Sequence, residues 1–357
     1  MAIRDIFIDK FSVFDNFKLD FCDGINVIIG NNGTGKTQLL KFLYALHESS
    51  SESYMNKNKF SNLTQTDGTP FFLPSAVRLG FIEDCFRLYV PYNRPQQNSI
   101  VSDKETILLL TTFDNITHEI SLNPSGDTNI IFSDNKQTHS KNSVFIPAKE
   151  MLSHASLLSM SEVFGHNMPY DVTYLKIIEQ ARRWKLNETP SIANGILKKL
   201  EKVMGGYVVV KDDGSFWMQG NSEATMIPFA NEADGLKRFG LLWQLLKNGS
   251  LNENTVLFWD EPENSVNPQH IPIIVDIMLE LQRKGVQIIF TTHNYHFMNY
   301  LNVMKEKTDS VKFISLKKDH LTTVFESAED YSELSFNSIV DGELKMYDDE
   351  LIKGFDV

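Results

Sequence analysis

The chain has 357 residues and a formal net charge of −12, with 42% hydrophobic and 22% charged residues. This length allows one large or two small domains, and the composition is that of an ordinary globular protein. The acidic balance argues against a uniformly basic surface that coats nucleic acid, because such a body repels phosphate.

Two features bear on the cellular compartment. Cys22 and Cys85 are too few for a disulfide scaffold and are typical of a reducing cytosol. The first residues contain no long apolar h-region, and no stretch of about 18 or more apolar residues follows. We therefore expect a cytoplasmic protein with no signal peptide and no membrane span.

Residues 3–29 predict three strands that lead directly into a glycine-rich loop. Residues 17–21 alternate apolar and polar side chains, as a half-buried strand does. Residues 25–29 are β-branched and mostly apolar, as a buried central strand should be. Apolar residues at helical spacing follow over residues 38–46, so the loop has the strand-before, helix-after context of a P-loop.

The loop from Gly30 to Thr37 fits the pattern Gly-x-x-x-x-Gly-Lys-Thr without a mismatch. Its glycines let backbone N–H groups turn toward phosphate oxygens, while Lys36 reaches the β- and γ-phosphates and Thr37 offers its hydroxyl to magnesium. The N-terminal end of the following helix also favours an anion. We predict that the chain binds ATP and Mg²⁺ here, through Asn31, Asn32, Gly33, Thr34, Gly35, Lys36, Thr37 and Gln38.

The middle of the chain predicts a second layer of structure. Residues 48–70 are rich in Ser, Asn, Thr and Lys, which indicates a mobile loop. Residues 76–146 hold short alternating runs that we interpret as an antiparallel layer. These runs are residues 87–90, 106–110, 117–120 and 129–132, and a further strand at 144–146 stops at Pro147.

The second half predicts helices and strands in alternation. Residues 170–204 predict two helical segments, and Asp213-Gly214 predicts a tight hairpin turn. Helices are expected over 235–247 and 272–283, with buried strands at 255–259 and 286–290. The tail holds strands at 311–315 and 322–325 before a short helical end. This alternation indicates an α/β fold.

The strand at 255–259 delivers an acidic pair, Asp260-Glu261, which is the Walker B arrangement. Asp260 would hold magnesium, usually through water, and Glu261 would polarise the attacking water as the general base. The alternative is a strand followed by an acidic turn that caps a helix.

The strand at 286–290 is followed by Thr291, Thr292 and His293, where a polar cluster can face the γ-phosphate at the carboxyl edge of the sheet. We predict that His293 contacts that phosphate and senses hydrolysis, and that His296 is structural. The sequence has no zinc-ligand spacing and no Ser-His-Asp or Cys-His arrangement.

These motifs, in this order, resemble the ATPase heads of the ATP-binding-cassette (ABC) superfamily, within its chromosome-maintenance and DNA-repair (SMC/RecF) branch, and especially OLD-family ATPases. The strands before Gly30 resemble the first hairpin of that branch, and Asn267 lies where its D-loop has an acidic residue. The resemblance implies one ABC-type head with a mixed, largely parallel core sheet, an antiparallel layer and a small helical lobe. We expect an N-terminal lobe (1–150), a helical insert (151–204) and a C-terminal part (205–357).

Such heads carry a signature loop that reaches the ATP of a partner subunit. The best match here places Ala233 and Asp234 before Gly235, instead of the usual Ser-Gly-Gly. The resemblance implies that Ala233, Asp234, Gly235 and Lys237 act in trans in a homo-oligomer, with Lys237 or magnesium offsetting the charge of Asp234. The alternative is that Asp234 is simply the N-cap of a helix that starts at Gly235.

Two functions remain in competition. The first is an ATPase switch that gates a separate effector; stand-alone OLD-like ATPases are often paired with a nuclease in bacterial anti-phage defence, so the resemblance implies such a partner. The second is a DNA-repair or recombination ATPase that binds DNA directly, through the locally basic stretch 176–202, which can also be a solvated helix face. A transporter subunit is disfavoured by the inserted strands and by Asp234.

Overall fold

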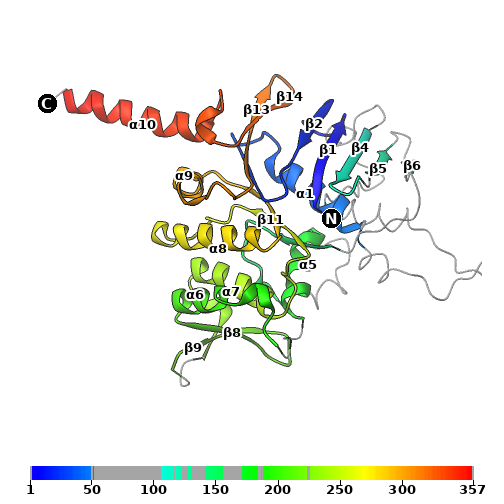
Figure 1. Ribbon diagram of the computed structural model, residues 1–357. Helices are drawn as coiled ribbons and strands as arrows, with labels where there is room; N and C mark the ends of the chain where they lie inside the picture. The colour runs from blue at the N-terminus through cyan, green and yellow to red at the C-terminus, as the bar shows by residue number, and fades with distance from the viewer. Residues whose placement is uncertain are drawn as a thin grey trace, which may run out of the picture.

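A six-stranded sheet forms the centre of the computed structural model (Figure 1). The structure describes residues 2–49, 51, 85, 106–115, 117–122, 128–129, 141–155, 171–183, 186, 188–222 and 226–355. The strands lie in the order β14 (Thr322–Ala328), β13 (Val311–Asp319), β3 (Ile25–Gly30), β12 (Gln287–Thr291), β11 (Thr255–Asp260) and β7 (Asn142–Ile146). All neighbours from β13 to β7 run parallel, and β14 pairs antiparallel with β13. The predicted mixed, largely parallel sheet is thus confirmed.

The central strands are apolar throughout because alternate residues enter two different cores. In β3, Val27 and Ile29 belong to one core and Ile28 to the other. In β11, Leu257 and Phe258 are divided in the same way. Since both faces of the sheet are covered, its polar chemistry is confined to the strand ends.

One face of the sheet packs on α1 (Lys36–Ser49) and on an antiparallel sheet, as the shared core of these elements shows. That second sheet has the order β2 (Phe17–Asp20), β1 (Ile3–Asp9), β4 (Thr106–Thr112), β5 (Thr117–Leu122) and β6 (Thr128–Asn129). The antiparallel layer is therefore confirmed, with β1 and β2 as members. The predicted strand at 87–90, the loop at 52–70 and residues 130–132 lie outside the described residues.

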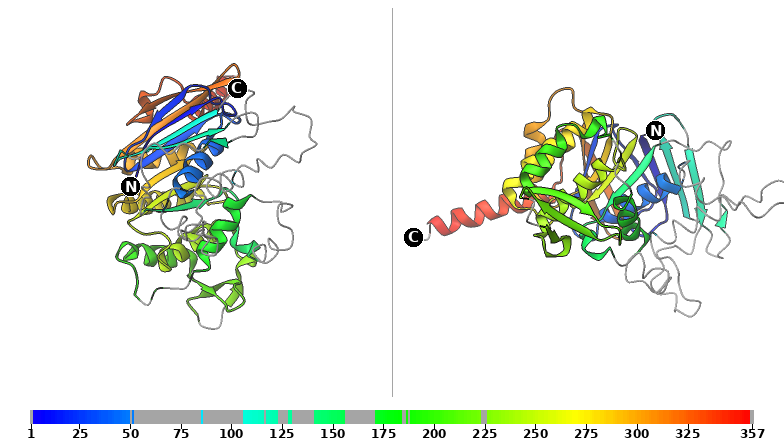
Figure 2. Two further views of the ribbon diagram at one scale, coloured as in Figure 1. Left: turned by 90° about the vertical axis from the view of Figure 1, so that its right-hand side faces the viewer. Right: turned by 90° about the horizontal axis from the view of Figure 1, so that it is seen from below.

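The other face carries α8 (Ile271–Arg283), α9 (Tyr295–Met304) and a helical lobe, shown in two further views in Figure 2. The lobe contains α5 (Val172–Ala181), α6 (Ile196–Met204), α7 (Asp234–Lys247) and a small sheet of β10 (Met226–Pro228), β9 (Phe216–Gly220) and β8 (Gly206–Val210). The predicted turn joins β8 to β9, and Gly214 adopts φ +77°, which glycine tolerates. Short 3₁₀ turns occupy Leu152–His154, Ser191–Ala193, Phe229–Asn231, Pro268–His270 and Tyr331–Glu333.

The C-terminal helix α10 (Ser338–Phe355) has 18 residues, so the prediction of a short helical end is wrong. It contacts α9 and β3 near its start, where Ile339 and Val340 pack on the core. The rest projects from the body in Figure 1 and in the right-hand view of Figure 2. Among the described helices, none is long and apolar enough to span a membrane.

Candidate functional site

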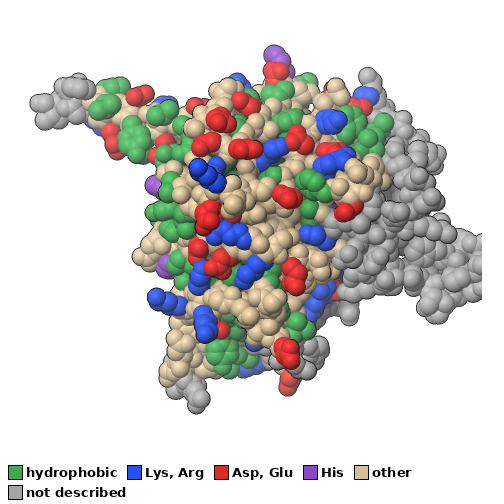
Figure 3. All heavy atoms as spheres, viewed as in Figure 1, with side chains coloured by type: hydrophobic (Ala, Val, Ile, Leu, Met, Phe, Trp, Pro, Cys, Tyr) green, Lys and Arg blue, Asp and Glu red, His purple; other side chains and the backbone are tan. Residues whose placement is uncertain are grey.

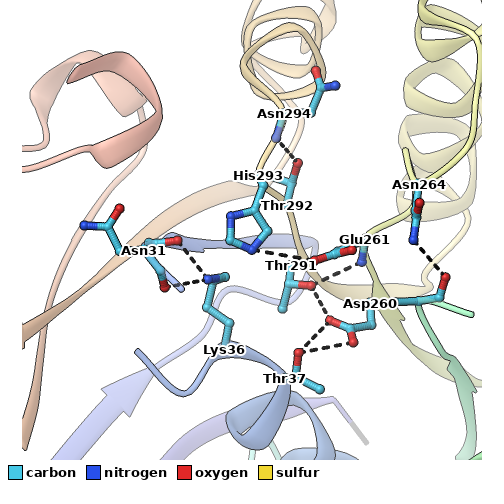
Figure 4. Close-up of polar contacts among 12 residues, drawn as sticks. Asn31, Lys36, Thr37, Asp260, Glu261, Asn264, Thr291, Thr292, His293 and Asn294 are labelled. Atoms are coloured by element: carbon cyan, nitrogen blue, oxygen red, sulfur yellow. Dashed lines mark hydrogen bonds and ion pairs between the residues drawn. The ribbon is translucent and has the colours of Figure 1, made fainter. Parts of the chain in front are cut away.

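The carboxyl ends of three neighbouring strands bring the predicted polar residues together (Figure 4). β3 and β11 lie on either side of β12, and the register pairs Asp260 with Thr291 and Thr291 with Ile28. The P-loop leaves β3 at this same edge and enters α1. Parallel strands place their carboxyl ends on one side, so motifs more than two hundred residues apart in the chain meet in one place.

Lys36 lies across the P-loop, where its Nζ donates to the carbonyl oxygens of Gly30 at 2.8 Å and Asn31 at 2.9 Å. Gly33 and Gly35 adopt φ +80° and +92°, a region that side chains with a Cβ rarely occupy. A Cβ on Gly35 would also lie 2.7 Å from the ring of Phe14. The loop shape therefore depends on glycine at these positions.

The hydroxyl of Thr37, in the first turn of α1, lies 3.2 Å from both carboxylate oxygens of Asp260. Thr291 donates its hydroxyl to Asp260 Oδ1 at 2.6 Å, so the carboxylate is fixed from β12 as well. Asp260 is buried. A hydroxyl and a carboxylate are the hard oxygen donors that Mg²⁺ prefers, so the residues present fit a magnesium site.

A metal bound here would need further ligands from its substrate or from water. Among the described residues, no group of three or more His, Cys, Asp and Glu side chains is placed to hold a metal. Mg²⁺ is commonly held by one or two protein oxygens together with substrate phosphates, which matches a site of this kind.

Glu261 follows the strand in a left-handed conformation, φ +51°, which is uncommon for a residue other than glycine. Its backbone N–H donates to the carbonyl of Thr291 at 3.2 Å, which fixes the turn. Its side chain is one-third exposed, and Oε1 lies 3.6 Å from Nε2 of His293. That separation is longer than a hydrogen bond, and the two side chains point toward one another (Figure 4).

The surroundings of the site shift the pKa values of Glu261, His293 and Lys36. Burial raises the pKa of Glu261 above its ordinary value, and Asp260 adds to the shift against Lys36 and Arg238. Burial, with help from Lys36, lowers the pKa of His293, so its imidazole is neutral at pH 7. Burial lowers the pKa of Lys36 to about 8, against the pull of Glu261 and Asp260. The pair Glu261–His293 is thus a contact of a carboxyl group with a neutral ring rather than an ion pair.

Glu263 is a site residue that the sequence did not single out. Its Oε1 accepts the hydroxyl of Thr292 at 2.6 Å and the backbone N–H of His293 at 3.0 Å. Its Oε2 is buried without a hydrogen-bond partner among the described residues. Burial raises the pKa of Glu263 despite these donors. The carboxylate therefore ties the turn after β11 to the turn after β12. In the sequence, its position two residues after Glu261 was the signal that could have identified it.

Arg238, on α7, is a second residue that the sequence did not single out. Its buried guanidinium donates to the carbonyl oxygens of Pro147, at 3.0 Å, and of Ala148. Asn264 also donates to the Ala148 carbonyl, at 3.2 Å. The segment after β7 is thereby joined both to α7 and to the turn after Asp260. A cavity of about 490 Å³ lies between these three segments.

The signature-like residues lie at the start of α7. Ala233 is the N-cap and Asp234 is already in the helix, so the alternative in which Asp234 caps a helix starting at Gly235 is wrong. Asp234 instead pairs with Lys237 at 2.9 Å, and Lys237 also donates to Ala230 O at 3.1 Å. A Cβ on Gly235 would lie 2.6 Å from Ser265 O, so glycine allows α7 to approach the turn after Walker B. Within the described part of the chain, the polar contacts of Asp234 and Lys237 lie at the start of α7 and do not reach the P-loop.

Asn267, the D-loop-like residue, accepts the backbone N–H of Gln269 at 3.0 Å and caps the following 3₁₀ turn.

Some basic side chains of the stretch 176–202 already contact other groups of the same chain. Lys199 pairs with Asp276 and Glu280, and Arg182 donates to the carbonyls of Gly214 and Ala155.

Comparison with known proteins decides the family. A family model described as "AAA domain, putative AbiEii toxin, Type IV TA system" matches residues 25–299, which is most of the chain. The chain belongs to this AAA-domain family. The matched range begins in β3 and ends in α9, so it contains the P-loop, Asp260-Glu261 and His293.

Relatives and solved structures agree on the branch. Two DNA replication and repair proteins RecF are 36% identical: that of Caldanaerobacter subterraneus over 78 residues (22% of this chain, 21% of RecF), and that of Clostridium acetobutylicum over 44 residues (12% of each). The matches thus cover 21% and 12% of the length of those two proteins. An SMC head bound to the C-terminal winged-helix domain of ScpA matches 94% of this chain and 100% of that one, at TM-score 0.55 and 11% identity.

A second SMC head, with an extended coiled coil and bound to ScpA's C-terminal domain, from Pyrococcus furiosus, matches 98% of this chain and 99% of that one, at TM-score 0.50 and 10% identity. At such identities the likeness concerns the fold. Together with the family, it confirms an ABC-type ATPase head of the SMC/RecF branch.

Proposed function

We propose that this protein is a magnesium-dependent ATPase that works as an oligomeric switch. The observation that carries the proposal is the convergence of Lys36, Thr37, Asp260 and Glu261 at one edge of the sheet, with Thr37 and Asp260 oxygens 3.2 Å apart. A pair of oxygen ligands for a cation, a phosphate-binding loop and a second carboxyl group beside them are the groups that phosphoryl transfer to water requires.

Each residue has one role in this proposal. Mg²⁺, when bound, neutralises charge on the nucleotide phosphates, and Thr37 and Asp260 would hold it. Lys36 would leave its two carbonyl partners for the β- and γ-phosphates. Asn31, Asn32, Gly33, Thr34, Gly35 and Gln38 would complete the cradle.

The chemical step needs a base and a water molecule. The water oxygen bonds to the γ-phosphorus while Glu261 accepts a proton from that water. The bond between the γ-phosphorus and the bridging oxygen of ADP breaks at the same time. The raised pKa of Glu261 makes its carboxylate a better base than an ordinary glutamate. His293, whose neutral ring lies 3.6 Å from Glu261, would contact the γ-phosphate and report its loss.

The second half of the site would come from another subunit. At the start of α7, Ala233 and Asp234 are exposed and Gly235 is half-buried. Lys237 is buried and already neutralises the charge of Asp234. This pairing removes the main electrostatic objection to an acidic residue approaching a partner's phosphate. Asn267 would lie at the same interface.

The switch would control a separate effector polypeptide, which we take to be a nuclease in a bacterial anti-phage system. The description of the family names a toxin–antitoxin system, which is an arrangement of two components and supports a separate partner. A cytoplasmic location follows from this proposal.

Phosphate release and nucleotide binding test the proposal together. The purified chain should bind a fluorescent ATP analogue and release phosphate only with Mg²⁺, and the rate per chain should rise with protein concentration if subunits complete the site. Binding without any release over hours would leave a nucleotide-binding protein and remove the ATPase.

Direct DNA binding by a repair ATPase is the second candidate, and the likeness to RecF favours it. Among the described residues of the basic stretch, Lys198 and Lys202 on α6 are exposed, as is Arg183, so the two lysines on one helix are available for such a role. Changing both to Glu should lower DNA affinity and flatten its salt dependence if this candidate holds. No binding of the wild-type chain to DNA at low salt would remove it.

A further inference from the structure

The helix α10 carries an apolar stripe that no described part of the chain covers. Leu344, Tyr347 and Leu351 are 57%, 53% and 60% exposed. They continue a line that starts at Val340, which packs on the main core where the helix leaves the body. Figure 3 shows hydrophobic and acidic side chains gathered along the projecting helix.

The spacing of the stripe is that of a helix-pairing seam. Val340, Leu344, Tyr347 and Leu351 are separated by four, three and four residues, the alternation of apolar positions that lets one helix pack along another. Each side of this seam is flanked by two acidic residues. They are Asp341, Glu343, Asp348 and Glu350.

These flanks decide what can cover the stripe. In a pair of helices the flanking positions of one face those of the other, so two copies of α10 would place carboxylates against carboxylates in either direction. An anionic membrane surface would be repelled in the same way, because membrane-surface helices carry Lys and Arg on their polar side. The same flanks would attract a partner with the opposite charge.

We propose that α10 is a docking helix for a different protein, whose apolar surface is flanked by Lys and Arg. The stripe would be buried between the partner's apolar side chains, and the four carboxylates would pair with its basic residues. The proposal stands independently of ATP hydrolysis, because α10 lies outside the site at the strand ends.

Two synthetic helical peptides of about three heptads test this surface, both with Leu along the seam and differing only in Lys or Glu at the flanks. Fluorescence anisotropy should show that the full-length chain binds the Lys-flanked peptide at least about tenfold more tightly than the Glu-flanked one, with binding weakened by salt. The Lys36→Ala chain should behave like the wild type.

Variants locate the surface. Leu344→Asp with Leu351→Asp should reduce binding of the Lys-flanked peptide at least about tenfold, because the seam is lost. Ile352→Asp is the matched control: Ile352 is 61% exposed and adjacent to Leu351, but it lies about 100° around the helix. It should bind as the wild type does.

Three results would overturn the proposal. Equal binding of both peptides would show unspecific adhesion, and equal loss in the control variant would place the contact elsewhere. A nucleotide-free wild-type chain that sediments as a dimer, and becomes monomeric on Leu351→Asp, would show that a second copy covers the stripe.

Discussion

A single carboxylate oxygen of Glu263 accepts the backbone N–H of His293 at 3.0 Å, and it also accepts the hydroxyl of Thr292 at 2.6 Å. The strand that ends in Asp260 is thereby tied to the strand whose end carries His293. A shift of either turn would alter the 3.6 Å contact between Glu261 and His293. Glu263 is thus a positioning residue in the proposed site.

Removing that acceptor should separate positioning from nucleotide binding. Glu263→Ala should lower the free energy of unfolding by about 1–3 kcal/mol, because the buried Thr292 and the backbone N–H of His293 both lose their acceptor, and should slow phosphate release about tenfold. Glu263→Gln keeps an acceptor oxygen and should stay within about threefold of the wild-type rate. Both variants should bind ATP normally. Equal losses in both would show that the charge, rather than the acceptor, matters.

Lys36 should make the nucleotide-free protein less stable near neutral pH. Its pKa falls from an ordinary 10.5 to about 8 on folding, so between these values the unfolded chain binds more protons and stability rises with pH. Compared with Lys36→Met, which has no such group, the wild type should gain up to about 3 kcal/mol between pH 8 and 10.5. Urea unfolding of both proteins across this range measures the difference. A constant difference would contradict the buried charge.

Mixing two inactive variants tests whether α7 acts in trans. Lys36→Ala should lack nucleotide binding, and Lys237→Gln should lack the residue that neutralises Asp234. A mixed dimer has one site with both parts intact, so an equimolar mixture should recover about a quarter of the wild-type rate.

The control mixture combines Lys36→Ala with Glu261→Gln. Both residues belong to the same half of a site, and no mixed dimer then contains an intact one. Recovery in both mixtures would reflect subunit-independent activity, and recovery in neither would place Lys237 in its own chain's structure.

The fold and the polar residues at the strand ends could be predicted because both depend on short stretches of consecutive residues. The loop Gly30–Thr37 and the pair Asp260-Glu261 follow apolar strands directly, and parallel strands bring such ends together. Glu263 and Arg238 could not be predicted in the same way, since their partners lie 29 and 91 residues away along the chain. Their roles exist only after the strands and α7 have packed.

Boundaries and free surfaces were less predictable than elements. The alternative interpretation made Asp234 the cap of α7, but the helix begins one residue earlier than that interpretation requires, a difference that fraying ends make common. The length of α10 was missed because its apolar positions form only a narrow seam between acidic residues, rather than the wide apolar face of a helix packed on a core. The exposed seam on α10 is visible only once the helix is known to leave the body.

Phosphate release by Glu261→Gln, measured beside ATP retention, tests the proposed ATPase most directly. The amide cannot accept the proton from water, whereas Lys36, Thr37 and Asp260 keep their places, so ATP should remain bound while turnover falls by about 10²- to 10⁴-fold. Lys36→Ala, in contrast, should lose ATP retention itself. Wild-type turnover in the Glu261→Gln protein would contradict the assignment of Glu261 as the base and, with it, the proposed hydrolytic site.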